Sequence, residues 1–327
     1  MPVLYVVEPG AKVTKEGQQL VISKDDRLLG EVEVQGLESV VVLSSVQVTT
    51  QALCELLRGG VEFALINSHG RLLGQLTPPT ANNLDLRRAQ YAAETDPLFA
   101  LTQSKLITAA KINNQCQVLL RHALDEPGAQ GAVEAAAAEL SVLADRVPQV
   151  TEIAALLGLE GQAATLYWKV FPQLLAPSGL SFPGRQKHPP PDPINAALSL
   201  GYSLLTNLLT SQLDAVGFDP YLGFLHQETY GHPALALDLA EPFRAPVVDR
   251  MTLRLFNLKI LCSDDFQPHP EGGLHLTDDA LRHFFAEWER VLQKLAIREA
   301  IRQQLEQLAR VYRGAEPGVQ PWRWMAR

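Results

Sequence analysis

The spacing of the apolar residues changes once along this chain, at the run Pro78-Pro79-Thr80-Ala81-Asn82-Asn83. Before the run, Val, Ile and Leu occur in short bursts separated by glycines, which is typical of β-strands joined by turns. After it, long stretches favour helices, and the paired prolines and asparagines suit a boundary between the two regions. The sequence therefore predicts an α+β fold, with a small N-terminal β-domain over residues 1–80, a linker over 81–90 and a larger all-α domain over 91–327.

The expected strands of the first region are short, and one helix interrupts them. Residues 31–34 read Glu-Val-Glu-Val, with the period of two that a half-buried strand requires. The segment 49–58 begins with threonine, continues with helix-forming residues and stops at Gly59-Gly60, so we expect a short helix there. The strands expected from their bursts of Val, Ile and Leu are residues 4–7, 20–22, 31–34, 40–43 and 61–66.

The second region carries helical patterns. Residues 84–122 contain no glycine and are expected to form long helices interrupted near Pro97. Thr277 is the expected N-cap of a helix over 277–313, whose first turn is acidic as the helix dipole favours. The other expected helices are residues 132–143, 193–216 and 249–261.

Composition narrows the class of protein. The 327 residues are 46% hydrophobic and 20% charged, enough for a sizeable core, and the formal net charge is −8. That charge argues against a protein that coats nucleic acid, because phosphate binding needs clustered Lys and Arg. The N-terminus has no signal-peptide pattern and no segment offers the ~20 apolar residues that span a bilayer, so a cytoplasmic protein without membrane contact is expected. The cysteines lie far apart and are expected to be buried, reduced thiols: Cys54, Cys116 and Cys262.

Several common active sites are missing from the sequence. It contains no P-loop, no Gly-rich dinucleotide fingerprint, no nucleophile elbow and no histidine pair at zincin spacing. His226 and His232 superficially resemble a metal motif, but their spacing puts them on opposite faces of a helix. Gly231 and Pro233 indicate a loop there in any case. His232 is therefore not expected to be a ligand.

Three other stretches place a potential metal ligand in an apolar setting, where an isolated charge would be costly. The first holds Glu160, which lies between Gly158 and Gly161 at an expected helix start. An acidic residue favoured by the helix dipole is the alternative interpretation. The second ends at His226, which follows a turn and an apolar approach, and a core histidine bonded to a carbonyl is the alternative there.

The third stretch contains Asp238 and Glu241. At this spacing both carboxylates face the same side of a helical turn, which Pro242 ends or kinks. Two carboxylates this close repel each other unless a cation or Arg244 lies with them. Two or three carboxylates and one histidine form a mixed oxygen and nitrogen set that suits Mg²⁺ or Mn²⁺, and this chemistry indicates phosphoryl transfer. The spacing alone leaves Asp238 and Glu241 equivalent.

These residues lie within a longer pattern. Its parts are residues 158–164 and 86–91, then 191–199, 201–202, 223–226, 238–244 and 248–250, which read GLEGQAA, LRRAQY, PDPINAALS, GY, GFLH, DLAEPFR and VDR. The pattern resembles the CRISPR-associated endonuclease and integrase that captures new spacers, and the resemblance covers nearly the whole chain.

The resemblance implies a fold, ligands and partners. The fold is a small N-terminal β-domain used for dimerisation, followed by a helical catalytic domain. The metal ligands fall on Glu160, His226 and Glu241, and Asp238 either supports a ligand or serves as the alternate carboxylate. The family forms homodimers around a small ferredoxin-like CRISPR-associated partner in prokaryotes, and acts on double-stranded and branched DNA.

The resemblance also implies a mechanism. The metal would polarise the scissile phosphate. Attack by a DNA 3'-hydroxyl would insert a new spacer into a CRISPR array by transesterification, and attack by water would give endonuclease activity. Candidate phosphate contacts, each of which could instead be an ordinary solvated charge, are Lys169, Arg244, Arg250 and Arg254, then Arg185, Lys187 and His188 before the prolines, and Arg87 and Arg88 at the start of the helical domain.

Two alternative functions stay open. One is a noncatalytic DNA-binding scaffold of a DNA-processing complex, and the other is an unrelated metallohydrolase that acts on small phosphoesters. The tail Trp322-Arg323-Trp324 is open as well, since it could contact a partner or DNA or be disordered.

Overall fold

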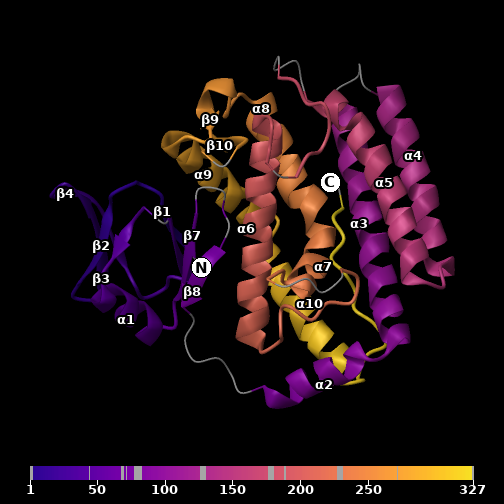
Figure 1. The fold of residues 1–327 in the computed structure, drawn as a ribbon, viewed down its shortest axis with the longest axis horizontal. Coiled ribbons are helices and arrows are strands. Elements are labelled where there is room, and N and C mark those ends of the chain that lie inside the picture. Colours follow the sequence, from indigo (N-terminus) through magenta and orange to yellow (C-terminus); the bar gives the residue numbers. More distant parts are fainter. Residues whose placement is uncertain are drawn as a thin grey trace.

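The computed structural model describes residues 3–43, 45–67, 70, 72–76, 83–125, 130–175, 180–187, 189–226, 231–270 and 272–325. Strands come first and helices follow, which confirms the expected α+β class (Figure 1). A short hairpin of β9 (Phe266–Pro268) and β10 (Leu274–Leu276) lies inside the region expected to be all-α.

Two sheets build the N-terminal region. One has the order β4-β3-β2-β6, and the other has the order β1-β5-β7-β8, in which β8 alone runs antiparallel to its neighbour. The helix α1 (Thr50–Arg58) begins as expected at Thr49, whose hydroxyl accepts a hydrogen bond from the Ala52 N–H. The strands are β1 (Val3–Val6), β2 (Lys12–Glu16), β3 (Gln19–Lys24), β4 (Arg27–Glu33), β5 (Ser39–Leu43), β6 (Gln47–Val48), β7 (Glu62–Ile66) and β8 (Leu72–Leu76).

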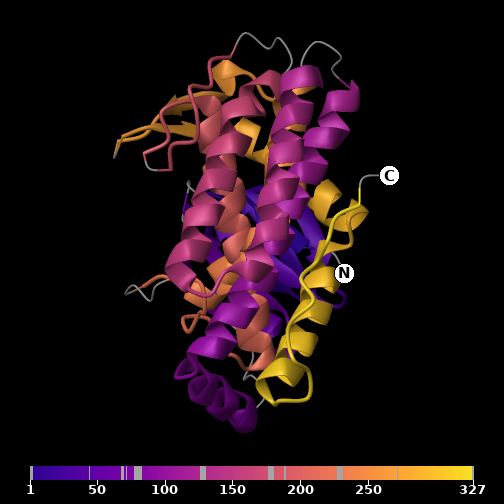
Figure 2. The ribbon, with the colours of Figure 1, turned by 90° about the vertical axis from the view of Figure 1, so that its right-hand side faces the viewer.

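The helical region is organised around α3 (Pro97–Asp125). The helices α4, α5 and α7 all pack against it, and Figures 1 and 2 show α3, α4 and α5 side by side. Pro242 lies inside α7, and a stretch of π-helix (Arg244–Asp249) links α7 to α8. The remaining helices are α2 (Leu84–Glu94), α4 (Gln130–Arg146), α5 (Ile153–Leu174), α6 (Pro193–Val216), α7 (Ala234–Phe243), α8 (Arg250–Asn257), α9 (Asp278–Lys294) and α10 (Ile297–Tyr312).

The sheet that contains β1 joins the two regions. The Tyr5 ring stacks on Phe285 of α9 with 4.5 Å between centroids, and the Tyr5 hydroxyl donates to Glu289 Oε1 at 2.7 Å. On β8, Gln75 Nε2 donates to Asp214 Oδ2 of α6 at 2.6 Å. The β-sheet region is therefore fixed to the helical region by aromatic stacking and by hydrogen bonds between side chains.

Several expectations differ from the structure in detail. The helix α2 begins at Leu84, inside the range 81–90 that was expected to be a linker. The expected helix over 277–313 is two helices, because Ala296 adopts a left-handed conformation with φ 49° between them. Cys116 is buried as expected, but Cys54 and Cys262 are exposed, and all three thiols are free.

Two further observations concern the chain as a whole. The tail is ordered on the protein itself, since the Trp324 N–H donates to Asn114 Oδ1 of α3 at 2.9 Å and the Trp322 ring stacks on Phe243 at 5.1 Å. None of the described helices is long and apolar enough to cross a membrane.

Candidate active site

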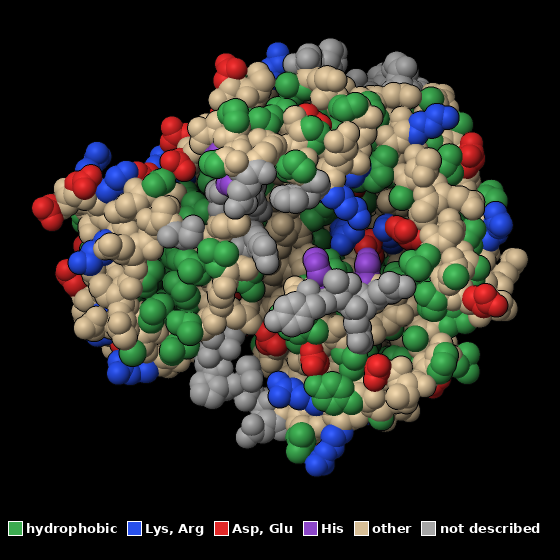
Figure 3. All heavy atoms as spheres, viewed as in Figure 1, with side chains coloured by type: hydrophobic (Ala, Val, Ile, Leu, Met, Phe, Trp, Pro, Cys, Tyr) green, Lys and Arg blue, Asp and Glu red, His purple; other side chains and the backbone are tan. Residues whose placement is uncertain are grey.

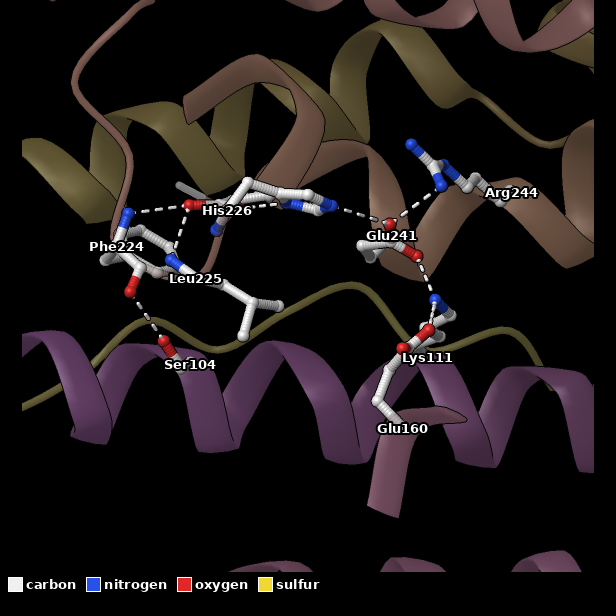
Figure 4. A network of polar contacts seen from close by, with 9 residues as sticks. Ser104, Lys111, Glu160, Phe224, Leu225, His226, Glu241 and Arg244 are labelled. Atoms are coloured by element: carbon white, nitrogen blue, oxygen red, sulfur yellow. Dashed lines mark hydrogen bonds and ion pairs between the residues drawn. The ribbon is translucent and has the colours of Figure 1, made fainter. Parts of the chain in front are cut away.

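Polar side chains from four segments meet beside α3. Lys111 comes from α3, Glu160 from α5, Glu241 from α7 and His226 from the loop before α7 (Figure 4). In the space-filling view, basic, acidic and histidine side chains gather around a hollow over these helices (Figure 3). We call these four residues and Arg244 the polar cluster.

Asp238 fixes the loop that carries His226. Its buried carboxylate accepts hydrogen bonds from the backbone N–H groups of Phe224 (2.7 Å), Leu225 (3.0 Å) and His226 (2.9 Å). His226 Nδ1 lies 2.5 Å from Asp238 Oδ1, and beside this acceptor Nδ1 is the nitrogen that carries the proton. The other ring nitrogen, Nε2, points toward Glu241 Oε1 at 3.7 Å (Figure 4).

Asp238 and Glu241, which their spacing in the sequence does not distinguish, have different surroundings in the structure. Asp238 uses both of its oxygens on the loop, whereas Glu241 reaches into the polar cluster. Gly223 makes the loop contact possible, because a Cβ there would lie 2.8 Å from Asp238 Oδ2 and 2.8 Å from the Ala234 Cβ. Asp238 is therefore placed to position His226, and Glu241 is placed to act directly.

Glu241 lies between two cations. Its side chain is 2% exposed, with Oε1 2.8 Å from Arg244 and Oε2 2.6 Å from Lys111 Nζ. Burial alone would raise the pKa of Glu241, but the positive charges of Arg244 and Lys111 outweigh burial and hold the pKa at about 2. The carboxylate is ionised at neutral pH and so is ready to bind a cation.

Glu160 lies inside α5, so the expectation that it starts a helix is wrong. The helix begins at Ile153 and continues through both neighbouring glycines, so the helix dipole does not explain this acidic residue. Glu160 forms an ion pair with Lys111. Burial would lower the pKa of Lys111, but Glu241 and Glu160 raise it, and the ammonium group holds the two carboxylates together.

The donor set suits a divalent ion, although Lys111 separates its members. Among the described residues, no group of three or more His, Cys, Asp or Glu side chains is arranged to hold a metal ion. The donor types nevertheless fit Mg²⁺ or Mn²⁺, because Glu160 and Glu241 both contact Lys111 and the imidazole of His226 lies beside Glu241. Glu241 Oε2 contacts Lys111 Nζ at 2.6 Å. Glu160, His226 and Glu241 could therefore hold a metal once Lys111 moves aside.

Arg244 brings the second positive charge to the polar cluster. Its guanidinium lies over the Tyr202 ring, 5.4 Å from the centroid. Its Nε is buried and has no hydrogen-bond acceptor among the described residues. A buried donor in this state suits an incoming anion such as phosphate, because guanidinium groups bind phosphate oxygens strongly.

A buried hydrogen-bond network supports the cluster from behind. Tyr202 of α6 donates to Asp249, which also accepts from Tyr167 of α5 at 3.0 Å. Burial raises the pKa of Asp249 to about 6, even though the two hydroxyl donors favour its charged form. The network ties α5 and α6 to the π-helical stretch that begins at Arg244.

Arg185 is the other expected phosphate contact that approaches the cluster. Its guanidinium also lies over Tyr202, at 5.3 Å from the centroid, and it donates to Asn195 Oδ1 at 2.9 Å. Arg250 and Arg254 instead belong to a separate group of arginines beside α9.

The remaining expected phosphate contacts that the structure describes are not part of the polar cluster. Lys169 and Lys187 are exposed. On α2, Arg87 donates to the Gly217 carbonyl at 3.1 Å and Arg88 pairs with Asp85 at 3.7 Å. His188 falls outside the described residues, and His232 is exposed.

The sequence reasoning missed Lys111 and Asn114. Asn114 Nδ2 donates to the Pro242 carbonyl at 2.6 Å and so supports the helix that carries Glu241. A signal was present: α3 carries a polar stripe at helical spacing, formed by the buried Ser104, Thr108 and Gln115 and the half-buried Lys111. A polar stripe on a buried face indicates side chains that meet other polar groups.

Solved structures share this fold. One chain of a "Cas6-RT-Cas1--Cas2 complex" superposes with a TM-score of 0.84 at 26% identity, over 99% of this chain and 36% of that longer one. A CAS1 protein from Thermotoga maritima superposes with a TM-score of 0.81 at 21% identity, over 97% of this chain and 98% of that one. A "Casposase bound to integration product" gives 0.82 at 24% identity, over 97% of this chain and 92% of that one.

Sequence comparison identifies the family. The family model described as "CRISPR associated protein Cas1" matches residues 4–290. The chain is 35% identical to the "CRISPR-associated endonuclease Cas1 2" of Rhodospirillum rubrum, over 98% of both proteins. It is 30% identical to the "CRISPR-associated endonuclease Cas1 1" of Chlorobaculum tepidum, again over 98% of both. The chain belongs to the Cas1 family, which confirms the resemblance seen in its sequence.

Proposed function

We propose that this chain is a divalent-metal-dependent DNA integrase and endonuclease that inserts new spacer DNA into a CRISPR array. The observation that carries the proposal is the convergence of Glu160, His226 and Glu241 beside two cations, Lys111 and Arg244. Carboxylates and imidazole suit a metal, and the cations suit a phosphate, so the cluster offers both parts of a phosphodiester site. Membership of a family whose relatives are named endonucleases supports the same function.

Four residues of the polar cluster and Asp238 have roles in this proposal. Glu160, His226 and Glu241 would hold Mg²⁺ or Mn²⁺, and the bound ion would supply Lewis-acid chemistry at the scissile phosphate. Asp238 keeps His226 Nε2 free and directed at the ligand position. Arg244 would bind a phosphate oxygen through its free Nε.

Spacer insertion is a transesterification. The oxygen of a DNA 3'-hydroxyl forms a bond to a phosphorus of the target strand, and the bond from that phosphorus to its own 3'-oxygen breaks. The proton lost by the attacking hydroxyl is matched by the one gained by the new 3'-hydroxyl. One phosphodiester replaces another, and with water as the attacking group the same cluster would give nuclease activity.

The proposed partners follow from the family and its structural relatives. We expect a homodimer formed through the N-terminal β-domain, assembled with a small ferredoxin-like CRISPR-associated protein on double-stranded and branched DNA. A similar chain occurs in a complex named for Cas1 and Cas2, and another was solved on an integration product, which supports this assembly. Local cations, rather than the net charge of −8, would attract the DNA.

One observation favours a second candidate, the noncatalytic DNA-binding scaffold. Lys111 and Arg244 already balance the charges of Glu160 and Glu241, so the cluster is electrically satisfied without a metal. A scaffold would bind DNA but would join no strands. The third candidate, a small-phosphoester hydrolase, would cleave a chromogenic phosphodiester and would not bind DNA tightly.

An integration assay separates the three candidates. It uses a DNA fragment with a free 3'-hydroxyl, a supercoiled CRISPR-array plasmid, the partner protein, and Mg²⁺ or Mn²⁺. We expect joined products from the wild type, and none from His226→Ala or Glu160→Ala although DNA binding persists. Glu139→Ala, which removes an exposed carboxylate on α4, is the matched control and should join normally. Full joining by His226→Ala would refute the site, and DNA binding without joining by the wild type would favour the scaffold.

A further inference from the structure

A second basic hollow lies outside the polar cluster. It has a volume of about 240 Å³ and is lined by four arginines: Arg121 at the end of α3, Arg250 and Arg254 on α8, and Arg290 on α9. We call these residues the arginine pocket. None of them contacts the polar cluster.

The positive charge of the arginine pocket is only partly neutralised. Glu287 is the carboxylate within the group, and it pairs with Arg254 at 2.8 Å and with Arg290 Nε at 2.8 Å. No carboxylate among the described side chains pairs with Arg121 or Arg250. Burial lowers the pKa of Arg250, and the positive charges of the neighbouring arginines lower it further.

Arg250 is held in place, and one of its hydrogen-bond donors lacks an acceptor among the described residues. Its guanidinium lies 4.7 Å from the centroid of the Trp324 ring, which restricts its movement. Its terminal NH1 atom is buried and has no hydrogen-bond acceptor among the described residues. A buried donor without an acceptor costs free energy. An anion in the arginine pocket would supply an acceptor.

The chemistry of the anion follows from the arginines. Guanidinium groups bind phosphate through paired hydrogen bonds, and they do so more strongly than ammonium groups. Arg121 follows Lys111 by ten residues on the same helix, which is ~15 Å along the axis. Phosphates of one duplex strand are spaced by ~3.4 Å along the DNA axis, so a strand bound at the polar cluster could place another phosphate in the pocket roughly four nucleotides away.

We propose that the arginine pocket binds a backbone phosphate of the DNA that occupies the polar cluster, several nucleotides from the reacting bond. The inference rests on the proposed function. The tail connects the two sites, because Trp322 stacks on Phe243 of the helix that carries Glu241 and Trp324 packs on Arg250. The pocket would therefore fix the position of the strand relative to the polar cluster.

The test measures DNA binding by fluorescence anisotropy at several salt concentrations. The double variant Arg121→Gln and Arg250→Gln is compared with Arg302→Gln and Arg310→Gln, which removes the same charge from exposed positions of α10. We expect the pocket variant to lose roughly tenfold or more in affinity, with a salt slope smaller by about 1 to 2. The control variant should keep the wild-type affinity and the wild-type salt slope. Equal affinity and slope in the two variants would overturn the proposal.

Two further experiments separate a folding failure, and the binding of free phosphates, from the binding of DNA. Arg121→Gln alone spares the Trp324 contact and should reduce the affinity and slope in the same direction if the double variant fails to fold. Inorganic phosphate and AMP are added in thermal denaturation. Stabilisation of the wild type but not of the pocket variant, with unchanged DNA affinity, would assign the pocket to free phosphates and overturn the DNA proposal. Failure of the proposed function is a separate result, since the wild type would then bind DNA but join no strands.

Discussion

Lys111 sets the charge balance at the centre of the polar cluster. Its ammonium group and the Arg244 guanidinium offset two carboxylates, so a divalent ion would leave an excess of positive charge. DNA phosphates would supply the missing negative charge, which couples metal binding to DNA binding. The sequence could not show this, because Lys111 is far in sequence from both of its partners.

Replacing Lys111 with Met should change how the protein responds to metal. Without metal, removal of one partner of a buried ion pair should cost about 3 kcal/mol. Mn²⁺ should raise the Tm of Lys111→Met more than that of the wild type, because the ion no longer displaces an ammonium group. Lys105→Met is the control on the same helix, since Lys105 donates to the Pro148 carbonyl at 3.1 Å and pairs with no carboxylate among the described residues. The same Mn²⁺ shift in variant and wild type would show that Lys111 does not compete with metal.

Asp249 should make stability depend on pH. Its pKa is about 6 in the folded protein and 3.8 as the ordinary value. Because the folded pKa is the higher one, this stabilising contribution is complete below about pH 4 and is lost as the pH rises through 6. Relative to Asp249→Asn, the wild type should lose ~3 kcal/mol of unfolding free energy from pH 4 to 7. Urea unfolding across that range measures the difference, and a pH-independent difference would contradict the assignment.

At the scale of the element, local sequence signals located most helices and strands. Thr49 and Thr277 are side-chain caps as expected, and α6 has the expected bounds Pro193–Val216. The strand β2 was missed because its residues are mostly polar or charged, so no burst of apolar residues marks it. The start of α5 was misplaced because two glycines indicated a boundary, whereas packing against α3 and α4 keeps the helix continuous.

The loop that carries His226 depends on Gly223. Gly223→Ala should destabilise the protein by about 1–3 kcal/mol, because the added methyl would press on Asp238 and Ala234. Movement of the loop should reduce strand joining more than DNA binding. Gly158→Ala is the matched control, since a Cβ at that position in α5 meets nothing within 4 Å, and it should be neutral or slightly stabilising. Equal activity in the two variants would show that the loop geometry is not required.

At the scale of the molecule, the sequence predicted the order of the two regions but not how they are joined. Tyr5, Gln75 and their partners on α9 and α6 are long-range contacts that carry no local pattern. The same is true of the tail, which folds back on α3 through Asn114. The polar cluster is also long-range: Glu160, His226 and Glu241 come from separate stretches of the sequence, and Lys111 was missed.

The outer surface of the N-terminal region should mediate dimerisation. Leu28 and Leu29 of β4 are 54% and 45% exposed, which is unusual for adjacent leucines on a strand. Leu28→Glu with Leu29→Glu should shift the protein from dimer to monomer in size-exclusion chromatography with light scattering. Val142→Glu, at an exposed apolar position of α4, should leave the dimer intact. A dimer that survives the β4 substitutions would place the interface elsewhere.

Metal binding tests the central claim most directly. Titration calorimetry of Mn²⁺ into the protein–DNA complex measures whether Glu160, His226 and Glu241 form one site. We predict one saturable Mn²⁺ site per protomer in the wild type, and loss of at least tenfold in affinity in Glu241→Gln and in His226→Ala, with DNA still bound. Unchanged Mn²⁺ affinity in both variants would contradict the assignment of these residues as metal ligands.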